Sequence, residues 1–159
     1  MNRVNFLRNY IIESKNDSGG SWEYSHTPFL TDYLKNLTEL ESIEFSNKIF
    51  EWNEDELYEI ADPIIWCENK FLDADYLYCK IFSKIDKSDY LEYLIENIIP
   101  YIHHIPNIRI QVWELDLLCN LNEKVLKTLS VKDVSWNLSL KKVTEFLEEH
   151  IKSRINNYS

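Results

Sequence analysis

Two stretches of the chain, 34 residues apart, carry nearly the same pattern of apolar residues. The first reads DELYEIADPII from Asp55, and the second reads DYLEYLIENII from Asp89. With a shift of 36 residues, a second set also repeats: Leu77, Ile81, Phe82 and Ile85 fall on Trp113, Leu117, Leu118 and Leu121. Both helices of a pair therefore recur with a period of about 35 residues, which is typical of an α-solenoid. A unit of this kind cannot bury its apolar face alone, so the next unit repeats the pattern to cover it.

Capping residues and helical spacing extend this pattern along the chain. Asn53 can cap a helix that begins at Glu54, with Glu56 at the third helical position of a capping box. Comparable helix starts are Asp73, Ser88 and Asn107. No stretch alternates convincingly between apolar and polar residues with a period of two, which would indicate a strand. The sequence therefore predicts an all-α protein.

We expect one all-helical domain over residues 1–159. Residues 54–122 are expected to form a compact antiparallel array of helix pairs, either a short α-solenoid or a bundle. The helix expected from Asn107 to Leu121 is apolar on nearly all sides, which places it at the centre. Residues 139–155 are expected to form an amphipathic C-terminal helix. Residues 14–28 hold the two glycines of the chain and are expected to form a loop.

A proline inside the first helix of the repeat carries a resemblance to a known family. Pro63, preceded by Asp62, resembles the proline found in the first helix of HEAT repeats. The resemblance covers roughly residues 54–122 and implies paired helices that stack on one another. In the second copy Asn97 stands at the position of Pro63, and the proline moves to Pro100. The glycine and alanine positions of tetratricopeptide repeats and the T-P-L-H signature of ankyrin repeats are absent.

The net charge of −10 is concentrated in one segment. Residues 39–75 hold twelve acidic and two basic residues, whereas residues 1–38 hold four of each and residues 76–159 hold eleven of each. Such a segment repels a nucleic-acid backbone and attracts a basic protein. No apolar run approaches a membrane span, and the first residues lead into no signal-peptide pattern. We therefore expect a cytoplasmic protein that binds neither nucleic acid nor membranes.

Motifs that would indicate an enzyme are missing from the sequence. It has no glycine-rich phosphate loop, no H-E-x-x-H and no G-x-S-x-G. His103 and His104 precede a proline, where they either meet the free carbonyls of a helix end or take a metal or acid–base role. Cys67, Cys79 and Cys119 are expected as buried reduced thiols, with a disulfide or a metal site as the alternative. We expect no catalytic residue, no metal and no cofactor.

The acidic segment predicts a surface for binding a partner. On a helix that starts at Asp55, the carboxylates of Asp55, Glu59 and Asp62 share the side opposite the apolar residues, and Trp66 falls among them. Trp66 either packs against a neighbouring helix around Phe45, Ile49 and Trp52, is rotated inward by Pro63, or anchors a basic partner. The candidate partner-binding residues are Glu51, Trp52, Asp55, Glu56, Glu59, Asp62, Trp66 and Glu68.

In general character, a small, acidic and aromatic-rich helical chain without catalytic motifs resembles the immunity proteins of bacterial toxin systems. The resemblance implies a non-enzymatic inhibitor that neutralises a cognate basic toxin, such as a nuclease, by binding it. An alternative is a HEAT-like scaffold or adaptor that binds its partner through the aromatic N-terminal loop near Trp22 and Tyr24. A further alternative is a helical-repeat enzyme that acts on nucleic-acid bases, which the negative charge disfavours.

Overall fold

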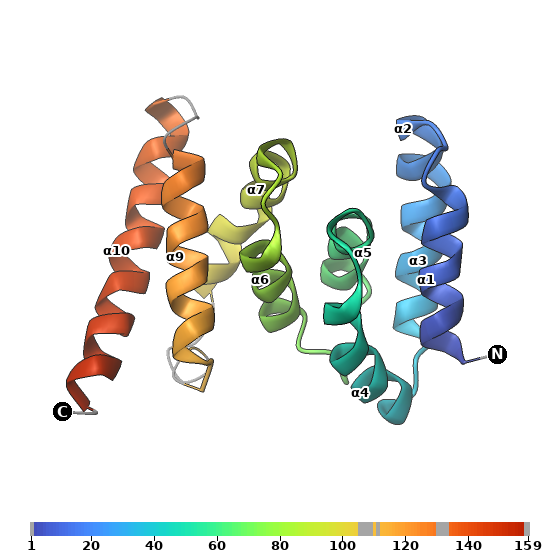
Figure 1. Cartoon of the computed structure of the whole chain (residues 1–159), viewed down its shortest axis with the longest axis horizontal. Coiled ribbons are helices and arrows are strands. Elements are labelled where there is room, and N and C mark those ends of the chain that lie inside the picture. The colour runs from blue at the N-terminus through green and yellow to red at the C-terminus, as the bar shows by residue number, and fades with distance from the viewer. Residues whose placement is uncertain (1, 105–109, 111, 130–133, 158–159) are drawn as a thin grey trace. The chain divides into compact units, whose positions relative to one another are not determined.

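The structure, a computed structural model, describes residues 2–104, 110, 112–129 and 134–157. All regular elements among these residues are helical and none is a strand, which confirms the all-α prediction (Figure 1). The α-helices are α1 (Arg3–Ser14), α2 (Gly19–Ser21), α3 (Thr27–Lys35), α4 (Glu39–Lys48), α5 (Glu54–Trp66), α6 (Ala74–Lys84), α7 (Ser88–His104), α9 (Leu115–Leu129) and α10 (Val134–Asn157). A π-helical segment, η1 (Trp22–His26), precedes α3, and a 3-10 turn, η2 (Ile49–Glu51), follows α4.

Local capping fixes several helix starts. The Asn53 side chain accepts a hydrogen bond from the Glu56 backbone N–H at 2.9 Å, and the Glu56 carboxylate accepts one from the Asn53 N–H at 3.1 Å. This is the predicted capping box, and α5 begins at the predicted residue. Thr38 and Glu41 form a second capping box at the start of α4. Before α6, Asp73 Oδ1 accepts a hydrogen bond from a backbone N–H of the first turn at 3.3 Å.

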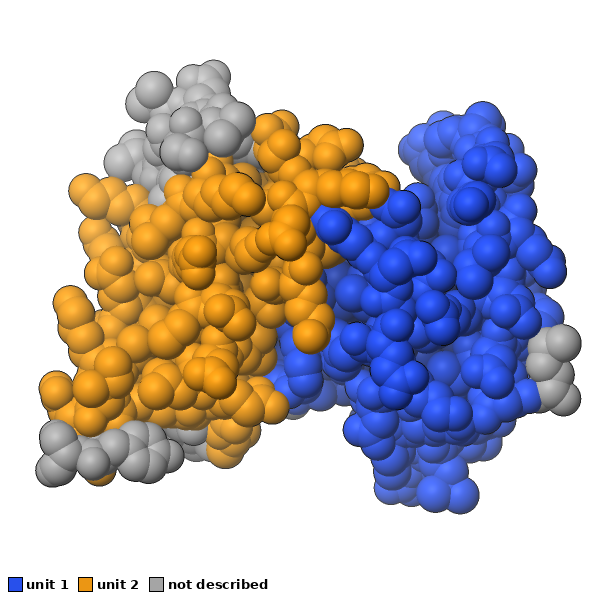
Figure 2. Space-filling view, in the orientation of Figure 1, with its two compact units in different colours: residues 1–81 blue, residues 82–159 orange. Residues whose placement is uncertain are grey.

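The chain divides into two compact units, residues 1–81 and residues 82–159 (Figure 2). The prediction of a single domain is not tested by this division and stays a prediction. In the first unit, α3 packs along α5, and α1 packs on α4 and α5. Leu7, Leu30 and Ile60 are fully buried between these helices. The buried side of α5 thus belongs to the core of the first unit.

A buried asparagine ties the end of α5 to α3. The Asn69 side-chain amide donates to the backbone carbonyls of Leu34 and Leu37 at 2.8 and 3.1 Å, and its oxygen accepts the Phe71 N–H at 2.8 Å. The carbonyls at a helix end lack partners within the helix, so these bonds satisfy them. Glu68, just before Asn69, has a φ of 53°, in the left-handed region in which helices commonly end.

The prediction that residues 14–28 form a loop is wrong, because most of this segment is helical. Ser18 accepts a hydrogen bond from the Ser21 N–H at 3.2 Å and so caps α2, which leads through η1 into α3. Neither glycine has a positive φ, so the glycine pair marks no turn. Trp22 is buried, and its Nε1–H donates to the Ser14 carbonyl at 3.2 Å. Burial of this indole holds the segment against α1.

In the second unit, α9 packs along α10, and both contact α7. The buried side chains of α9 include Leu118, Leu121 and Val125, and those of α10 include Val143 and Leu147. α10 contains the whole of the predicted C-terminal helix and begins earlier, at Val134. Val143 and Leu147 belong to the apolar stripe at helical spacing from which the sequence predicted this C-terminal helix.

The predicted continuous helix from Asn107 to Leu121 is wrong. Residues 105–109 and 111 lie outside the described residues, but Val112–Glu114 is not helical and α9 begins only at Leu115. The Trp113 N–H donates to the Ile110 carbonyl at 3.1 Å, which is the geometry of a turn. Trp113 is buried all the same. The apolar run therefore predicted the burial of Ile110, Trp113 and Leu118, but Val112 is 79% exposed and the conformation differs from the prediction.

The repeated apolar positions agree in burial. Ile81, Phe82 and Ile85 of the earlier copy, and Leu117, Leu118 and Leu121 of the later copy, are all buried. α5 continues through Pro63 without a break, although proline supplies no backbone N–H to the helix. Both observations are compatible with a helical repeat. Membership of the HEAT class stays a prediction.

Candidate partner-binding site

The outer side of α5 carries a line of three carboxylates and one indole. Asp55, Glu59, Asp62 and Trp66 stand at helical spacings of four, three and four residues, which places them on one side of the helix. The residues buried in the core, such as Ile60 and Ile64, occupy the opposite side. We call Asp55, Glu59, Asp62 and Trp66 the α5 stripe. The sequence predicted this arrangement.

The three carboxylates repel one another, and Glu59 shows this most clearly. It is half-buried, whereas Asp55 is exposed. Burial, followed by the negative charges of Asp62 and Asp55, raises the pKa of Glu59 from its ordinary value of 4.5 to about 7. Near neutral pH, the α5 stripe therefore holds negative charge that its surroundings disfavour. A cation placed beside the α5 stripe would offset the repulsion among its carboxylates.

Trp66, at the last position of α5, is 59% exposed. The alternatives in which it packs around Phe45, Ile49 and Trp52 or is rotated inward by Pro63 are therefore wrong. An indole buries a large apolar area when a partner covers it, and tryptophan is enriched among the residues that dominate binding energies. Its exposure next to the carboxylates makes it the strongest anchor candidate on this helix.

Two of the predicted site residues, Trp52 and Glu56, have buried side chains. Trp52 is 7% exposed, and its ring meets the Phe45 ring edge-on with centroids 6.1 Å apart. Glu56 is 5% exposed, forms the capping box and pairs with Arg8 Nε at 3.0 Å. Neither side chain is presented to a partner in this structure. The two residues position α5 against α1 and α4 and do not belong to its outer surface.

The remaining predicted residues, Glu51 and Glu68, lie at the two ends of α5. Both are exposed. Glu51 ends the turn before the helix, and Glu68 follows it in the left-handed conformation. They extend the negative surface beyond the α5 stripe without being part of it.

A hydrogen-bonded relay in the first unit was missed by the sequence analysis. The Tyr10 hydroxyl lies 2.7 Å from His26 Nδ1, and His26 Nε2 lies 2.7 Å from Asp17 Oδ2. Burial, and then the charge of Asp17, raises the pKa of Tyr10. The His26 ring also contacts the Trp22 ring, with centroids 4.9 Å apart. No spacing motif links residues 10, 17 and 26, so only the fold brings them together.

This relay joins η1 to α1, and the aromatic rings of α1 and α3 continue the contact. Tyr10 stacks on Phe29 with centroids 4.4 Å apart, and Phe6 stacks on Tyr33 at 5.0 Å. The i, i+4 spacing of aromatic residues in both helices was the sequence signal from which this stacking could have been predicted.

Trp22, the expected anchor of the alternative adaptor, is buried, whereas Tyr24 is 78% exposed.

The described residues contain no group of three or more His, Cys, Asp or Glu side chains placed to hold a metal ion. The three cysteines are free; Cys67 and Cys79 are buried as predicted, whereas Cys119 is exposed on α9, contrary to the prediction. His103 and His104 stand in the last turn of α7. Within the described part of the chain, no helix has the length and apolar character needed to cross a membrane.

A comparison of the chain with protein-family models finds no match, and comparisons with curated proteins and with solved structures find none either.

Proposed function

We propose that the protein is a non-enzymatic inhibitor that binds a basic protein partner in the cytoplasm through the α5 stripe. The most specific form of this proposal is an immunity protein that neutralises a cognate basic bacterial toxin. The observation that carries it is the exposed Trp66 in line with the carboxylates of Asp55, Glu59 and Asp62. The net charge of −10 and its concentration in residues 39–75 support a cationic partner.

The proposed mechanism has two parts. The carboxylates attract a cationic surface during encounter, which raises association rates by roughly 10-fold to 1000-fold at low salt. Trp66 then buries its ring against the partner and slows dissociation. When the covered surface is a nucleic-acid-binding groove, inhibition follows from exclusion alone and needs no chemistry.

The test uses a basic protein domain captured as a binding partner of the protein and measures its association and dissociation rates. Asp55→Lys/Asp62→Lys is expected to slow association on the order of tenfold at low salt, with a smaller effect at high salt. Trp66→Ala is expected to raise the dissociation rate, at a cost of about 2 kcal/mol in binding free energy. Glu145→Lys/Glu149→Lys is the matched control, because it makes the same charge change at exposed positions of α10.

An unchanged association rate for Asp55→Lys/Asp62→Lys, together with an unchanged salt dependence, would contradict the proposed site.

The second candidate, an adaptor, is favoured by Tyr24, which is strongly exposed on the π-helical segment. π-Helical segments occur frequently at functional sites. Loss of binding in Tyr24→Ala, with normal binding in the α5 variants, would support the adaptor instead.

A further inference from the structure

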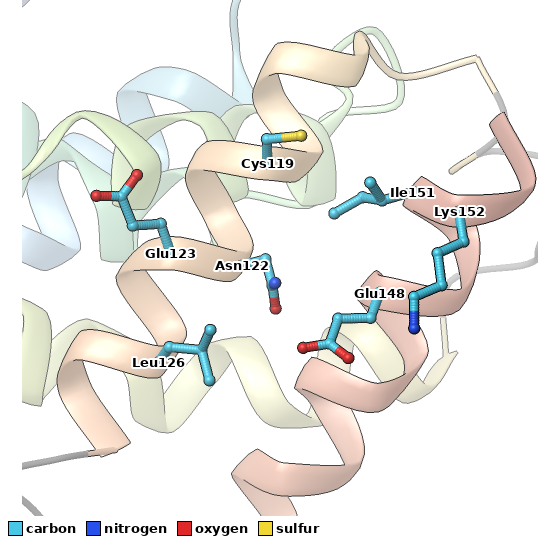
Figure 3. A pocket seen from close by; sticks show the side chains of 7 residues that line it. All are labelled: Cys119, Asn122, Glu123, Leu126, Glu148, Ile151 and Lys152. Atoms are coloured by element: carbon cyan, nitrogen blue, oxygen red, sulfur yellow. The ribbon is translucent and has the colours of Figure 1, made fainter. Parts of the chain in front are cut away.

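The second unit contains a pocket between α9 and α10 that the proposed function does not use. Its volume is about 310 Å³, at the lower end of the range for small-molecule sites (Figure 3). α9 contributes Cys119, Asn122, Glu123 and Leu126, which stand at the i, i+3, i+4 and i+7 positions of one helix side. α10 contributes Glu148, Ile151 and Lys152 in the same way. Two helix sides thus face each other across an open space.

Asn122 is the unusual residue of this pocket. Its Oδ1 is buried and accepts no hydrogen bond from any described residue. A buried carbonyl oxygen without a donor costs free energy, and each such group in a folded protein needs an explanation. The neighbouring positions towards the core, Leu121 and Val125, are fully buried and apolar. The amide therefore stands at the edge of the core, where a bound molecule that donates an N–H would satisfy it.

The hydrogen-bond acceptors of the pocket indicate the chemistry of that molecule. The lining has two carboxylates, Glu123 and Glu148, and one ammonium, Lys152. Figure 3 shows the Glu148 carboxylate extending from α10 into the space between the helices, on the side of Asn122, whereas Glu123 points away from it. Two oxygen acceptors thus converge on one region. Such a pair is suited to a positively charged N–H donor.

Most of the remaining pocket surface is carbon. Ile151 extends from α10 towards α9 across the space, and Leu126 lies on the α9 side below Asn122 (Figure 3). Leu126 is 45% exposed, so a ligand that covers it gains apolar burial. The ligand must therefore combine an apolar body with a cationic end.

We propose that the pocket between α9 and α10 binds a small primary amine as its ammonium ion. The ammonium donates to Asn122 Oδ1 and to the Glu148 carboxylate, and the apolar stem lies against Leu126 and Ile151. All of these residues belong to the second unit. The proposal is therefore independent of the α5 stripe and of the basic protein partner.

The test uses three probes with the same apolar stem and different ends: 3-phenylpropylamine, 3-phenylpropanol and 3-phenylpropionate. Each is titrated into the full ¹⁵N-labelled chain at pH 7 and followed by two-dimensional NMR. The amine is expected to give saturable shifts that centre on α9 and α10 around Asn122 and Glu148. The affinity should fall in the order amine, alcohol, carboxylate, with at least about tenfold between the first and the last. Absence of saturable shifts with the amine, or equal binding of the carboxylate, would overturn the proposal.

Variants of Asn122 separate a binding role from a structural one. Asn122→Ala removes the acceptor and should weaken amine binding by about tenfold or more. Asn120→Ala is the matched control, because Asn120 is exposed on the same helix and does not line the pocket. Ile151→Trp fills the pocket from α10 and should abolish amine binding. This second variant tests the site if Asn122→Ala fails to fold. Wild-type amine affinity in a folded Asn122→Ala protein, or in Ile151→Trp, would refute the site.

Discussion

Neutralising Glu59 should make the protein more stable at neutral and alkaline pH. Glu59 is half-buried beside two other carboxylates, and its pKa in the folded protein is about 7 instead of 4.5. Between these two pH values, the folded state holds a proton that the unfolded chain has already released. Stability therefore falls as the pH rises from 4.5 to 7, and the loss is complete above 7. Glu59→Gln keeps the shape of the side chain and removes the charge, so it should remove this loss.

The structure sets an upper limit on the effect. A pKa raised from 4.5 to about 7 corresponds to roughly 3 kcal/mol, at about 1.4 kcal/mol per pKa unit. Glu59 keeps part of its surface in water, and water screens the repulsion from Asp62 and Asp55, so we expect a measured gain of about 1–2 kcal/mol. The gain should be largest above pH 7 and should shrink as the pH is lowered towards 4.5.

Urea unfolding of the wild type and of Glu59→Gln at pH 5.5, 6.5, 7.5 and 8.5 measures this gain directly. The free energy of unfolding of Glu59→Gln should exceed that of the wild type by an amount that grows with pH up to about 7. Glu51→Gln is the control, since Glu51 is exposed and its neutralisation should give no such trend. A Glu59→Gln protein no more stable than the wild type at pH 8.5, or a gain independent of pH, would refute the reasoning.

Two further predictions concern groups that the fold buries. Asn69→Ala removes two hydrogen bonds to carbonyls at the end of α3 and one from a backbone N–H. It should therefore lower the free energy of unfolding, measured by urea unfolding, by about 2–4 kcal/mol. A change below about 0.5 kcal/mol would contradict this account. In the native protein, an uncharged alkylating reagent should label Cys119 quickly and Cys67 and Cys79 only on unfolding, because burial shields the latter two thiols and raises their pKa values. Mass spectrometry of the labelled protein checks this order, and fast labelling of Cys79 would contradict the described core.

The features that the sequence predicted correctly depend on neighbours within one or two helical turns. The capping box of Asn53 and Glu56 joins residues three positions apart, and its geometry follows from local backbone chemistry. The α5 stripe likewise follows from the 100° step between helical residues. Residue types at short, fixed spacings contain enough information for both.

The features that the sequence analysis missed depend on contacts between distant residues. Glu56 could equally have faced solvent, and its burial results from the approach of Arg8, 48 positions away. Trp52 is buried because α4 places Phe45 beside it. In the segment of residues 14–28, the burial of Trp22 outweighs the preference of a glycine pair for turns. None of these outcomes follows from the residue types alone.

The two faces of α5 separate the fold from the proposed binding activity. Ile60 and Ile64 bury one face, and substitutions there would change the core before they changed any surface. Asp55 and Asp62 stand on the other face, so their reversal should alter the association rate while the core of the first unit persists. Glu59 lies between these cases, because burial and the neighbouring carboxylates raise its pKa while it is also part of the α5 stripe. Its negative charge lowers the stability of the free protein above pH 7, and a cationic partner would offset that charge. Glu59 therefore links the stability of the fold to the proposed binding. Glu59→Gln should therefore stabilise the free protein and weaken its attraction for a basic partner at the same time, whereas a purely structural Glu59 would give only the first effect.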